Sequence, residues 1–273
     1  MTAEIPENVI EVENLVAHYG DRTILHDINL SIRAGEIMVI MGGSGSGKTT
    51  LMRNFLGLNK PTSGNIRVFG KDITRISTRE LYDIRRKIGV AFQGGALLGS
   101  MSVAENIELP LRQHTRLDES TIRIMSRMKL EVVNLAGFED LMPSELSGGM
   151  LKRAALARSI IMDPSLLFFD EPSAGLDPVV SAELDELILR LKAAMNVAIV
   201  VVTHELESAF KIADRITVLG HGKVLLTGTV DEIQASENEE IQDMLHRRPR
   251  DEAINAEEYL ARLTADRNQR RYI

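Results

Sequence analysis

The residues from Gly42 to Thr49 constrain this chain more than any other segment, because they read Gly-Gly-Ser-Gly-Ser-Gly-Lys-Thr and complete the pattern G-x-x-x-x-G-K-[ST]. A short apolar run, residues 36–41, precedes the pattern, and residues 50–57 follow it with helical spacing. A strand, a loop and a helix in this order form a phosphate-binding loop. Glycines let successive N–H groups turn toward an anion, and the helix adds its positive dipole end. The segment therefore predicts a nucleoside triphosphate site.

The residues of this loop are expected to divide the work of holding the triphosphate. The Lys48 ammonium can reach the β- and γ-phosphates, and the Thr49 hydroxyl can bind Mg²⁺. A glycine-rich turn that binds nothing is the alternative, and the complete pattern disfavours it. The residues predicted to bind nucleotide here are Gly42, Gly43, Ser44, Gly45, Ser46, Gly47, Lys48, Thr49 and Thr50.

Composition narrows the class of protein. A chain of 273 residues can bury one large core or two modest ones, and it has no stretch of eighteen apolar residues that would span a membrane. The N-terminus lacks the basic and apolar regions of a secretory signal, and there is no cysteine. A formal net charge of −7 disfavours a nucleic-acid partner, which would select a basic face. A soluble cytoplasmic protein is expected.

Hydrophobic patterning predicts an α/β fold with two kinds of sheet. Residues 9–30 form short alternating segments typical of antiparallel strands, whereas the later segments alternate between helix and strand and predict a parallel sheet covered on both faces. Ligands of such sheets bind at the carboxyl ends of the strands. The expected strands are 65–69, 88–92, 166–169, 197–202 and 216–219; the expected helices are 78–87, 118–137, 147–162, 179–194 and 205–213, with a loop and short helix over 94–110.

Two carboxylates end an apolar strand that reads Leu166-Leu-Phe-Phe-Asp170-Glu171. Strand side chains alternate in direction, so the two neighbouring acids can do different jobs. Asp170 is expected to hold the Mg²⁺ shell, and Glu171 is expected to orient or deprotonate the attacking water. A solvated strand end without chemistry is the alternative.

A second glycine-containing segment, Leu146-Ser147-Gly148-Gly149-Met150, opens a long amphipathic helix. Ser147 has the position of an ordinary N-cap. Two glycines in a first helical turn cost about 1 kcal/mol each relative to alanine, which makes sense if the backbone approaches a ligand closely. The segment therefore predicts a second anion site at a helix N-terminus.

Together, the phosphate loop, Gln93, the Leu-Ser-Gly-Gly segment, the Asp-Glu strand end and His204 resemble an ABC (ATP-binding cassette) ATPase in order and spacing, over residues 9 to about 235. The resemblance implies a P-loop parallel sheet with an N-terminal antiparallel β subdomain and an inserted helical subdomain over about 94–162. It places the cassette in residues 1–235 and leaves residues 236–273 as a charged C-terminal helical extension.

The resemblance also implies roles for single residues, with ATP and Mg²⁺ as cofactors. Tyr19 would stack on adenine, and Gln93 would touch Mg²⁺ and the water while sensing the transport partner. Ser147, Gly148 and Gly149 would bind the γ-phosphate, Asp177 would communicate across a dimer, and His204 would hold the γ-phosphate. The plainer alternatives are a half-buried strand aromatic for Tyr19, a polar loop residue for Gln93, and a capping or core histidine for His204.

In that family the signature of one cassette completes the ATP site of another. This chain carries one copy of each motif, so the resemblance implies a head-to-tail homodimer with two composite sites that ATP closes and hydrolysis at Glu171 reopens.

Three local features are similar to the ATPases of MCE-associated (Mla-type) phospholipid transporters: Met150 in the signature, the segment 94–107 after Gln93, and the helix continuing through residues 151–158. This resemblance implies a polytopic inner-membrane permease and an MCE-domain lipid-binding protein, and it leaves room for a small STAS-domain regulator. The chain would then sit at the cytoplasmic face of the inner membrane, held there by the permease. Met150 departs from the more common glutamine, which leaves binding through backbone N–H groups unaffected.

Several alternatives stay open at this point. The rivals are a small-solute importer ATPase, a soluble ABC protein acting on protein or nucleic acid, and a non-hydrolysing subunit. The segment 94–101, with Leu97, Leu98 and Met101 expected to be exposed, either contacts the permease or folds under its own helices. Helix 118–137 is either scaffold or a docking element. The tail, with a predicted helix over 251–267, is either solvated or docks on a neighbouring subunit.

Overall fold

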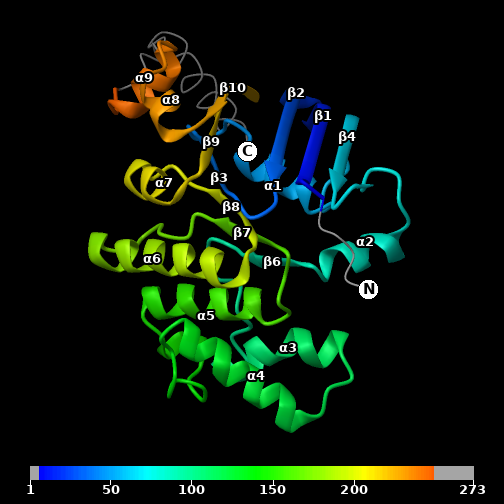
Figure 1. Cartoon of the computed structure of the whole chain (residues 1–273), viewed down its shortest axis with the longest axis vertical. Helices are drawn as coiled ribbons and strands as arrows, with labels where there is room; N and C mark the ends of the chain where they lie inside the picture. Colours follow the sequence, from blue (N-terminus) through cyan, green and yellow to red (C-terminus); the bar gives the residue numbers. More distant parts are fainter. Residues whose placement is uncertain (1–5, 249–273) are drawn as a thin grey trace, which may run out of the picture.

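The computed structural model describes residues 6–248, which form a layered arrangement of two sheets and the helices around them (Figure 1). One sheet has six strands in the order β10-β9-β3-β8-β7-β6, and the other has four in the order β2-β1-β4-β5. The strands are β1 (Asn8–Tyr19), β2 (Arg22–Arg33), β3 (Ile37–Gly42), β4 (Ser63–Val68), β5 (Lys71–Asp72), β6 (Ile88–Ala91), β7 (Leu166–Asp170), β8 (Ala198–Val202), β9 (Arg215–Gly220) and β10 (Lys223–Gly228).

The six-stranded sheet confirms the predicted parallel core. Its central strands β3, β7 and β8 are buried along their whole length, as their apolar and β-branched sequences require. Strand β3 pairs in parallel with β8 and β9, and β7 pairs in parallel with β6 and β8. Because Ile40 and Asp170 both face Val202 in register, the carboxyl ends of β3, β7 and β8 meet at one edge. The phosphate loop follows β3 at that edge.

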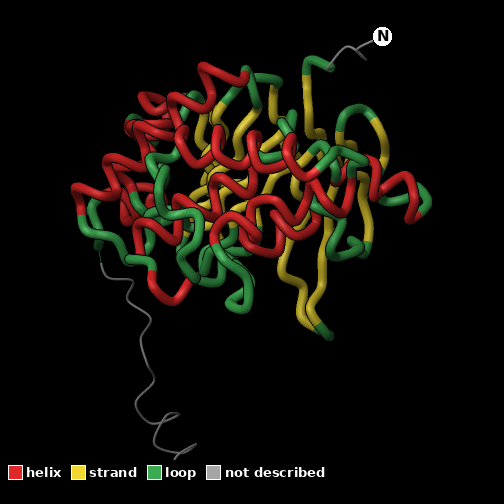
Figure 2. Tube along the Cα trace, turned by 90° about the horizontal axis from the view of Figure 1, so that it is seen from below, coloured by secondary structure: helices red, strands yellow, loops and turns green. Residues whose placement is uncertain are grey.

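The four-stranded sheet is antiparallel, as residues 9–30 predicted. Its apolar side chains share a core with the first helix, α1 (Lys48–Phe55), and with one face of the parallel sheet. The Phe55 and Phe168 rings, 6.3 Å apart between centroids, join the helix to β7. Figure 2 shows helices lying over the strands in a second view. Helix α1 is thus fixed between the two sheets, and its N-terminus is held at the strand edge.

The other helices of the described residues are α2 (Thr78–Arg85), α3 (Val103–His114), α4 (Glu119–Val132), α5 (Gly148–Ile160), α6 (Pro178–Met195), α7 (Leu206–Ile212), α8 (Val230–Gln234) and α9 (Glu239–Leu245), with a 3₁₀ turn at Pro143–Glu145. The loop and short helix expected over 94–110 was wrong in extent, because α3 continues through Pro110 to His114. A proline inside a helix removes one backbone hydrogen bond. Val103, Ile107 and Leu111 compensate by packing into the core.

The C-terminal part of the described chain holds elements that were not predicted. Strand β10 makes a hairpin with β9 through His221 and Gly222, which both have positive φ angles. Helices α8 and α9 follow, and Ile241 of α9 is fully buried in the core of the cassette. The boundary after residue 235 stays a prediction, although the packed core continues beyond it. The helix predicted over 251–267 lies outside the described residues.

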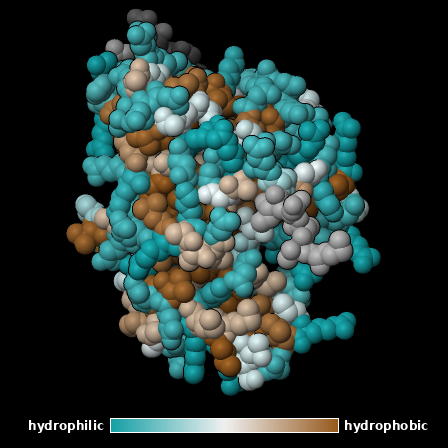
Figure 3. Space-filling view, viewed as in Figure 1, coloured by the Kyte–Doolittle hydropathy of each residue, from teal (hydrophilic) through white to brown (hydrophobic). Residues whose placement is uncertain are grey.

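The surface of the helical part carries more apolar side chains than the rest of this face. Figure 3 shows them gathering over the lower half, where α4, α5 and α6 lie. Large exposed apolar residues of this region are Leu98, Ile124, Met128, Val132, Phe138 and Val179. Within residues 6–248, no helix combines the length and the apolar character that crossing a bilayer requires.

Gly89 in β6 sets how closely α5 approaches the sheet. A Cβ atom there would overlap the Ser159 carbonyl oxygen and lie 2.9 Å from the Ser159 carbonyl carbon, so backbone would have to move. We expect Gly89→Ala to lower the free energy of unfolding by about 1–3 kcal/mol, the usual cost of overpacking. Urea unfolding would measure it. Gly99→Ala, at a position with open space and no positive φ, is the matched control and should not destabilise the protein. Equal stability of the two variants would contradict the packing explanation.

Candidate nucleotide-binding and hydrolysis site

The phosphate loop has a backbone that only glycine adopts easily at three positions, Gly42, Gly45 and Gly47. Gly42 has a φ of 151°, and a Cβ there would overlap the Leu219 carbonyl oxygen and lie 2.6 Å from Ser46 Oγ. Gly47 has a φ of 100°, and a Cβ there would lie 2.6 Å from Leu25 Cδ2. Helix α1 begins at the next residue, Lys48, without a side-chain cap. Its first N–H groups are therefore left for another acceptor.

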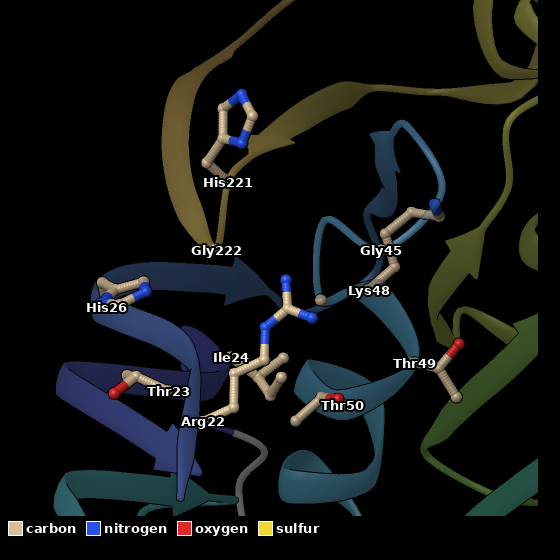
Figure 4. A pocket seen from close by; sticks show the side chains of 11 residues that line it. Arg22, Thr23, Ile24, His26, Gly45, Lys48, Thr49, Thr50, His221 and Gly222 are labelled. Carbon is tan, nitrogen blue, oxygen red and sulfur yellow. The ribbon is translucent and has the colours of Figure 1, made fainter. Parts of the chain in front are cut away.

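A cavity of about 580 Å³ opens over this loop, within the usual range for small-molecule sites. In Figure 4 the His26 and His221 side chains lie on the opposite side of the view from Lys48 and Thr49. The wall opposite the loop comes from β2 and from the β9–β10 hairpin, which carry none of the predicted site residues. The lining residues are Arg22, Thr23, Ile24, His26, Gly45, Gly47, Lys48, Thr49, Thr50, His221 and Gly222.

Two polar groups of the loop, Lys48 Nζ and Ser46 Oγ, are suited to bind an anionic ligand. Lys48 Nζ donates to the carbonyl oxygens of Gly42 and Gly43, at 2.7 and 3.0 Å, which bends its side chain back over the loop. Burial lowers the pKa of Lys48, while the charges of Glu171 and Asp170 oppose that shift. Ser46 Oγ is buried and has no hydrogen-bond partner among the described residues. Such a group is costly unless a ligand or water satisfies it.

Asp170 and Glu171 lie beside the loop. Strand alternation was predicted to separate the directions of their two carboxylates, but a turn of the backbone does so instead. Strand β7 ends at Asp170, and Glu171 already has a left-handed φ of 48°. The Glu171 N–H donates to the Val202 carbonyl oxygen at 2.8 Å, which holds this turn against β8. Burial is the main cause that raises the pKa of Asp170; the Glu171 charge adds to it, and Lys152 and Lys48 oppose it. The two carboxylates therefore point differently because the backbone turns between them.

The Glu171 carboxylate is held by two residues that follow β8. Thr203 Oγ1 donates to Glu171 Oε2 at 3.2 Å, and His204 Nδ1 lies 2.8 Å from Glu171 Oε1. Thr203 Oγ1 also accepts from the Glu205 N–H at 3.0 Å, and Thr203 is fully buried. His204 was predicted from the sequence, whereas Thr203 was not, although its position directly after the buried strand β8 was an available signal. This geometry fixes both oxygens of one carboxylate at the strand edge.

Gln93 is exposed, and the loop after it is tied to the helical part by a buried side chain. The Asn106 amide accepts from the Leu98 N–H at 2.7 Å and donates to the carbonyl oxygens of Leu98, Met101 and Ser102, each at 3.0 Å. Of Leu97, Leu98 and Met101, which were predicted to be exposed, only Leu98 is exposed, at 44%. Leu97 packs against the core, and Met101 is half-buried. Asn106 was not singled out in the sequence.

The segment Ser147-Gly148-Gly149 starts α5 away from the cavity. Ser147 Oγ accepts from the Met150 N–H at 3.3 Å, the geometry of an N-cap. A Cβ on Gly149 would lie 2.8 Å from Val180 Cγ1, so packing on α6 is enough to require this glycine. Gly148 has room for a side chain, with the nearest atom 3.7 Å away. None of the three lines the cavity, and Figure 1 shows α1 and α5 on opposite sides of β6 and β7.

Asp177 and Tyr19 also lie outside the cavity lining. Asp177 caps α6: its Oδ1 accepts from the N–H groups of Val179 and Val180, at 3.0 and 3.1 Å. Tyr19 ends β1 and is 81% exposed, which excludes the alternative of a half-buried strand aromatic. Asp170, Glu171 and His204 do not line the cavity either, but the two carboxylates act on the charge of Lys48, and His204 contacts Glu171, so these residues lie together beside the loop. The signature and Asp177 remain apart from them.

The residues predicted to hold Mg²⁺ are one hydroxyl, one carboxylate and one amide, those of Thr49, Asp170 and Gln93. Among residues 6–248 no cluster of three or more histidine, aspartate or glutamate side chains could hold a metal. A single carboxylate suits Mg²⁺, which commonly keeps its waters and binds phosphate oxygens beside one or two carboxylates. These side chains therefore fit a metal that arrives with the nucleotide.

Comparisons with known proteins identify the class. The family model "ABC transporter" matches residues 25–174, which include the phosphate loop, the signature and the β7 carboxylates. A cassette solved as a dimer in a post-hydrolysis state, bound to ADP and Pi, superposes with a TM-score of 0.75 at 31% identity, covering 81% of this chain and 98% of that one. The chain belongs to the ABC transporter family and is one of its ATP-binding, ATP-hydrolysing cassettes.

Two relatives with described transport functions are similar to this chain over most of its length. The intermembrane phospholipid transport system ATP-binding protein MlaF of Haemophilus influenzae is 46% identical over 85% of this chain and 88% of its own length. A protein of Mycobacterium leprae, described as a probable ribonucleotide transport ATP-binding protein, is 40% identical over 88% of this chain and 69% of its own length.

Proposed function

We propose that this chain is the ATP-hydrolysing subunit of an ABC transporter that powers phospholipid transport between membranes through a separate permease. The observation that carries the proposal is the 46% identity to the phospholipid-transport relative across most of both chains. The phospholipid-transport relative also aligns over more of its own length, 88% against 69% for the ribonucleotide-transport relative, which favours lipid over a small solute. That relative makes a solute importer the second candidate.

The phosphate loop supplies the binding part of this function. Its N–H groups and the N-terminus of α1 surround the phosphates, and Ser46 Oγ gains the partner that it lacks within the described chain. Lys48 turns from the loop carbonyls to the β- and γ-phosphates, and Tyr19 packs on the base. Thr49, Asp170 and Gln93 would hold Mg²⁺, which would supply positive charge beside the phosphates.

Glu171 is the proposed general base of hydrolysis. Thr203 and His204 fix both carboxylate oxygens, so the group is oriented before water arrives. Glu171 then orients the attacking water and accepts its proton. His204 lies next to both the base and the strand edge; its Nε2 is 3.4 Å from Glu205 Oε1 and would turn from that carboxylate to the γ-phosphate. Its 59% exposed side chain leaves room for that contact.

We assign the signature to the nucleotide held by a second cassette. The exposure of Ser147 and Gly148 at the N-terminus of α5 supports this assignment, because a second cassette could bring an anion to this helix end. Asp177 would lie at the same contact. The dimeric state of the solved neighbour supports a head-to-tail homodimer with two composite sites.

The proposed partners are a polytopic permease and an MCE-domain lipid-binding protein, with room for a STAS-domain regulator. The chain would be held at the cytoplasmic face of the inner membrane by the permease. Affinity purification of the tagged protein from native membranes in mild detergent, with mass spectrometry of proteins and lipids, tests this assembly. A permease with an MCE protein and phospholipid supports it. A solute permease, or soluble partners alone, overturns the lipid assignment and keeps the ATPase.

The loop after Gln93 is the proposed permease contact, and Leu98 is its exposed apolar residue. We expect Leu98→Asp to reduce permease recovery in that purification by about tenfold or more, because a buried carboxylate at an interface is costly. Leu117→Asp is the matched control: Leu117 is also exposed, at 42%, and precedes α4. Unchanged permease recovery with Leu98→Asp would exclude this contact.

A further inference from the structure

Lys152, in the second turn of α5, touches two segments of the site that are remote in sequence. Its Nζ donates to the carbonyl oxygen of Gln93, and it donates to the carbonyl oxygen of Glu171 at 3.0 Å. Both bonds run from a charged donor to backbone, which makes them stronger than bonds between neutral groups. The side chain is half-buried and does not line the nucleotide cavity. Lys152 thus fixes backbone position without facing the nucleotide.

A second cation of the same helix holds the same loop. Arg158 donates to the carbonyl oxygens of Ala96 and Gly95, at 2.8 and 3.0 Å. Gly95 also lies against Leu151, because a Cβ there would be 2.6 Å from Leu151 Cδ2. The start of this loop, residues 93–96, is therefore attached to α5 by Lys152 and Arg158, so that a displacement of the helix displaces it.

Lys152 also completes the restraint on Glu171. The N–H of Glu171 is held by the Val202 carbonyl oxygen, its carboxylate by Thr203 and His204, and its carbonyl oxygen by Lys152. The residue has a left-handed φ of 48°, a conformation that persists only where its surroundings hold it. The Glu171 carbonyl oxygen also accepts from the Ala174 N–H at 3.3 Å, so loss of the Lys152 contact would leave only this local bond and would remove the tie to α5.

We infer that Lys152 is a positioning residue that ties the signature-bearing helix α5 to Glu171 and thereby couples the two nucleotide sites of the dimer. The inference rests on the proposed head-to-tail dimer. There, Ser147 and Gly148 at the start of α5 meet the nucleotide of the other cassette, whereas Glu171 acts on the nucleotide of its own. Lys152, one helical turn after the signature, thus connects the contact with one nucleotide to the hydrolysis of the other.

The test is steady-state ATP hydrolysis by the full-length protein with Mg²⁺, measured across ATP concentrations. We expect Lys152→Met to lower kcat by about tenfold or more, since misplacing a catalytic group by about 1 Å can cost up to about a hundredfold. The KM for ATP should change by less than about twofold, because Lys152 lies outside the cavity. The Hill coefficient should fall from above 1 in the wild type to about 1. Lys152→Arg, which keeps a charged donor, should retain most of the wild-type kcat and of the wild-type Hill coefficient.

The matched control is Lys129→Met on α4, which removes a partly buried lysine whose partner is Asp163 at 2.6 Å. It should keep the wild-type kcat and Hill coefficient. Binding of a fluorescent ATP analogue reports whether Lys152→Met is folded; if it is not, Lys152→Gln takes its place under the same criteria.

Unchanged kcat and Hill coefficient in the Lys152 variant would overturn the inference, as would a rise in KM alone or a wild-type Hill coefficient of 1. Activity in Glu171→Gln would instead overturn the proposed catalytic site, so the two failures are distinguishable.

Discussion

Glu171→Gln is expected to lower the kcat of ATP hydrolysis by about 10²–10⁴-fold, the usual contribution of a general base. The glutamine side chain can still bond to Thr203, but it cannot accept a proton from water. ATP should therefore bind and remain unhydrolysed, and the closed dimer should accumulate. A phosphate-release assay measures the first effect. Size-exclusion chromatography with ATP and Mg²⁺ measures the second.

The control for this variant is Glu207→Gln, which removes the same charge from an exposed position on α7 and should leave turnover unchanged. Two results would count against the assignment. Turnover by Glu171→Gln within a few-fold of the wild type would exclude this residue as the base. A variant that binds ATP and stays monomeric would exclude the ATP-closed dimer.

Lys48→Ala is expected to weaken ATP binding, whereas Glu171→Gln is expected to keep it. Hydrogen bonds to charged groups contribute about 1.5–3 kcal/mol, so ATP binding should weaken by about tenfold to a hundredfold. Hydrolysis should be lost as well, because the γ-phosphate loses its main counter-charge. Equilibrium binding of a fluorescent ATP analogue measures the affinity.

Lys60→Ala, at an exposed position after α1, is the control and should bind ATP as the wild type does. Wild-type affinity of Lys48→Ala for ATP would contradict a phosphate contact by Lys48. In the wild type, the Lys48 side chain would then keep its bonds to Gly42 and Gly43 when nucleotide is present. The contrast between Lys48→Ala and Glu171→Gln separates binding from catalysis.

The parallel sheet was predictable because its strands are apolar runs that only a doubly covered sheet buries, as β7 and β8 illustrate. The phosphate loop was predictable for a similar local reason, since its glycines and Lys48 lie next to one another in the chain. Strand β10 was missed although His221 and Gly222 mark a hairpin turn. The extent of α3 was missed because Pro110 suggested an earlier end.

The contacts around the carboxylates could not be predicted, because they depend on tertiary placement. Lys152 reads as a solvated residue of an amphipathic helix until the fold puts Gln93 and Glu171 beside it. The left-handed turn at Glu171 likewise depends on the Val202 carbonyl of the neighbouring strand. Sequence patterns therefore indicated the groups that are proposed to carry chemistry, and the fold identified the groups that contact them.

That this chain powers phospholipid transport can be tested by measuring ATP-dependent transfer of a fluorescent phospholipid between two vesicle populations. The first population contains the membrane complex purified through this chain, and Glu171→Gln complex is assayed in parallel. The account predicts transfer that requires ATP and Mg²⁺ with the wild-type complex and is lost with the variant. ATP hydrolysis by the wild-type complex without any ATP-dependent change in phospholipid transfer would contradict it.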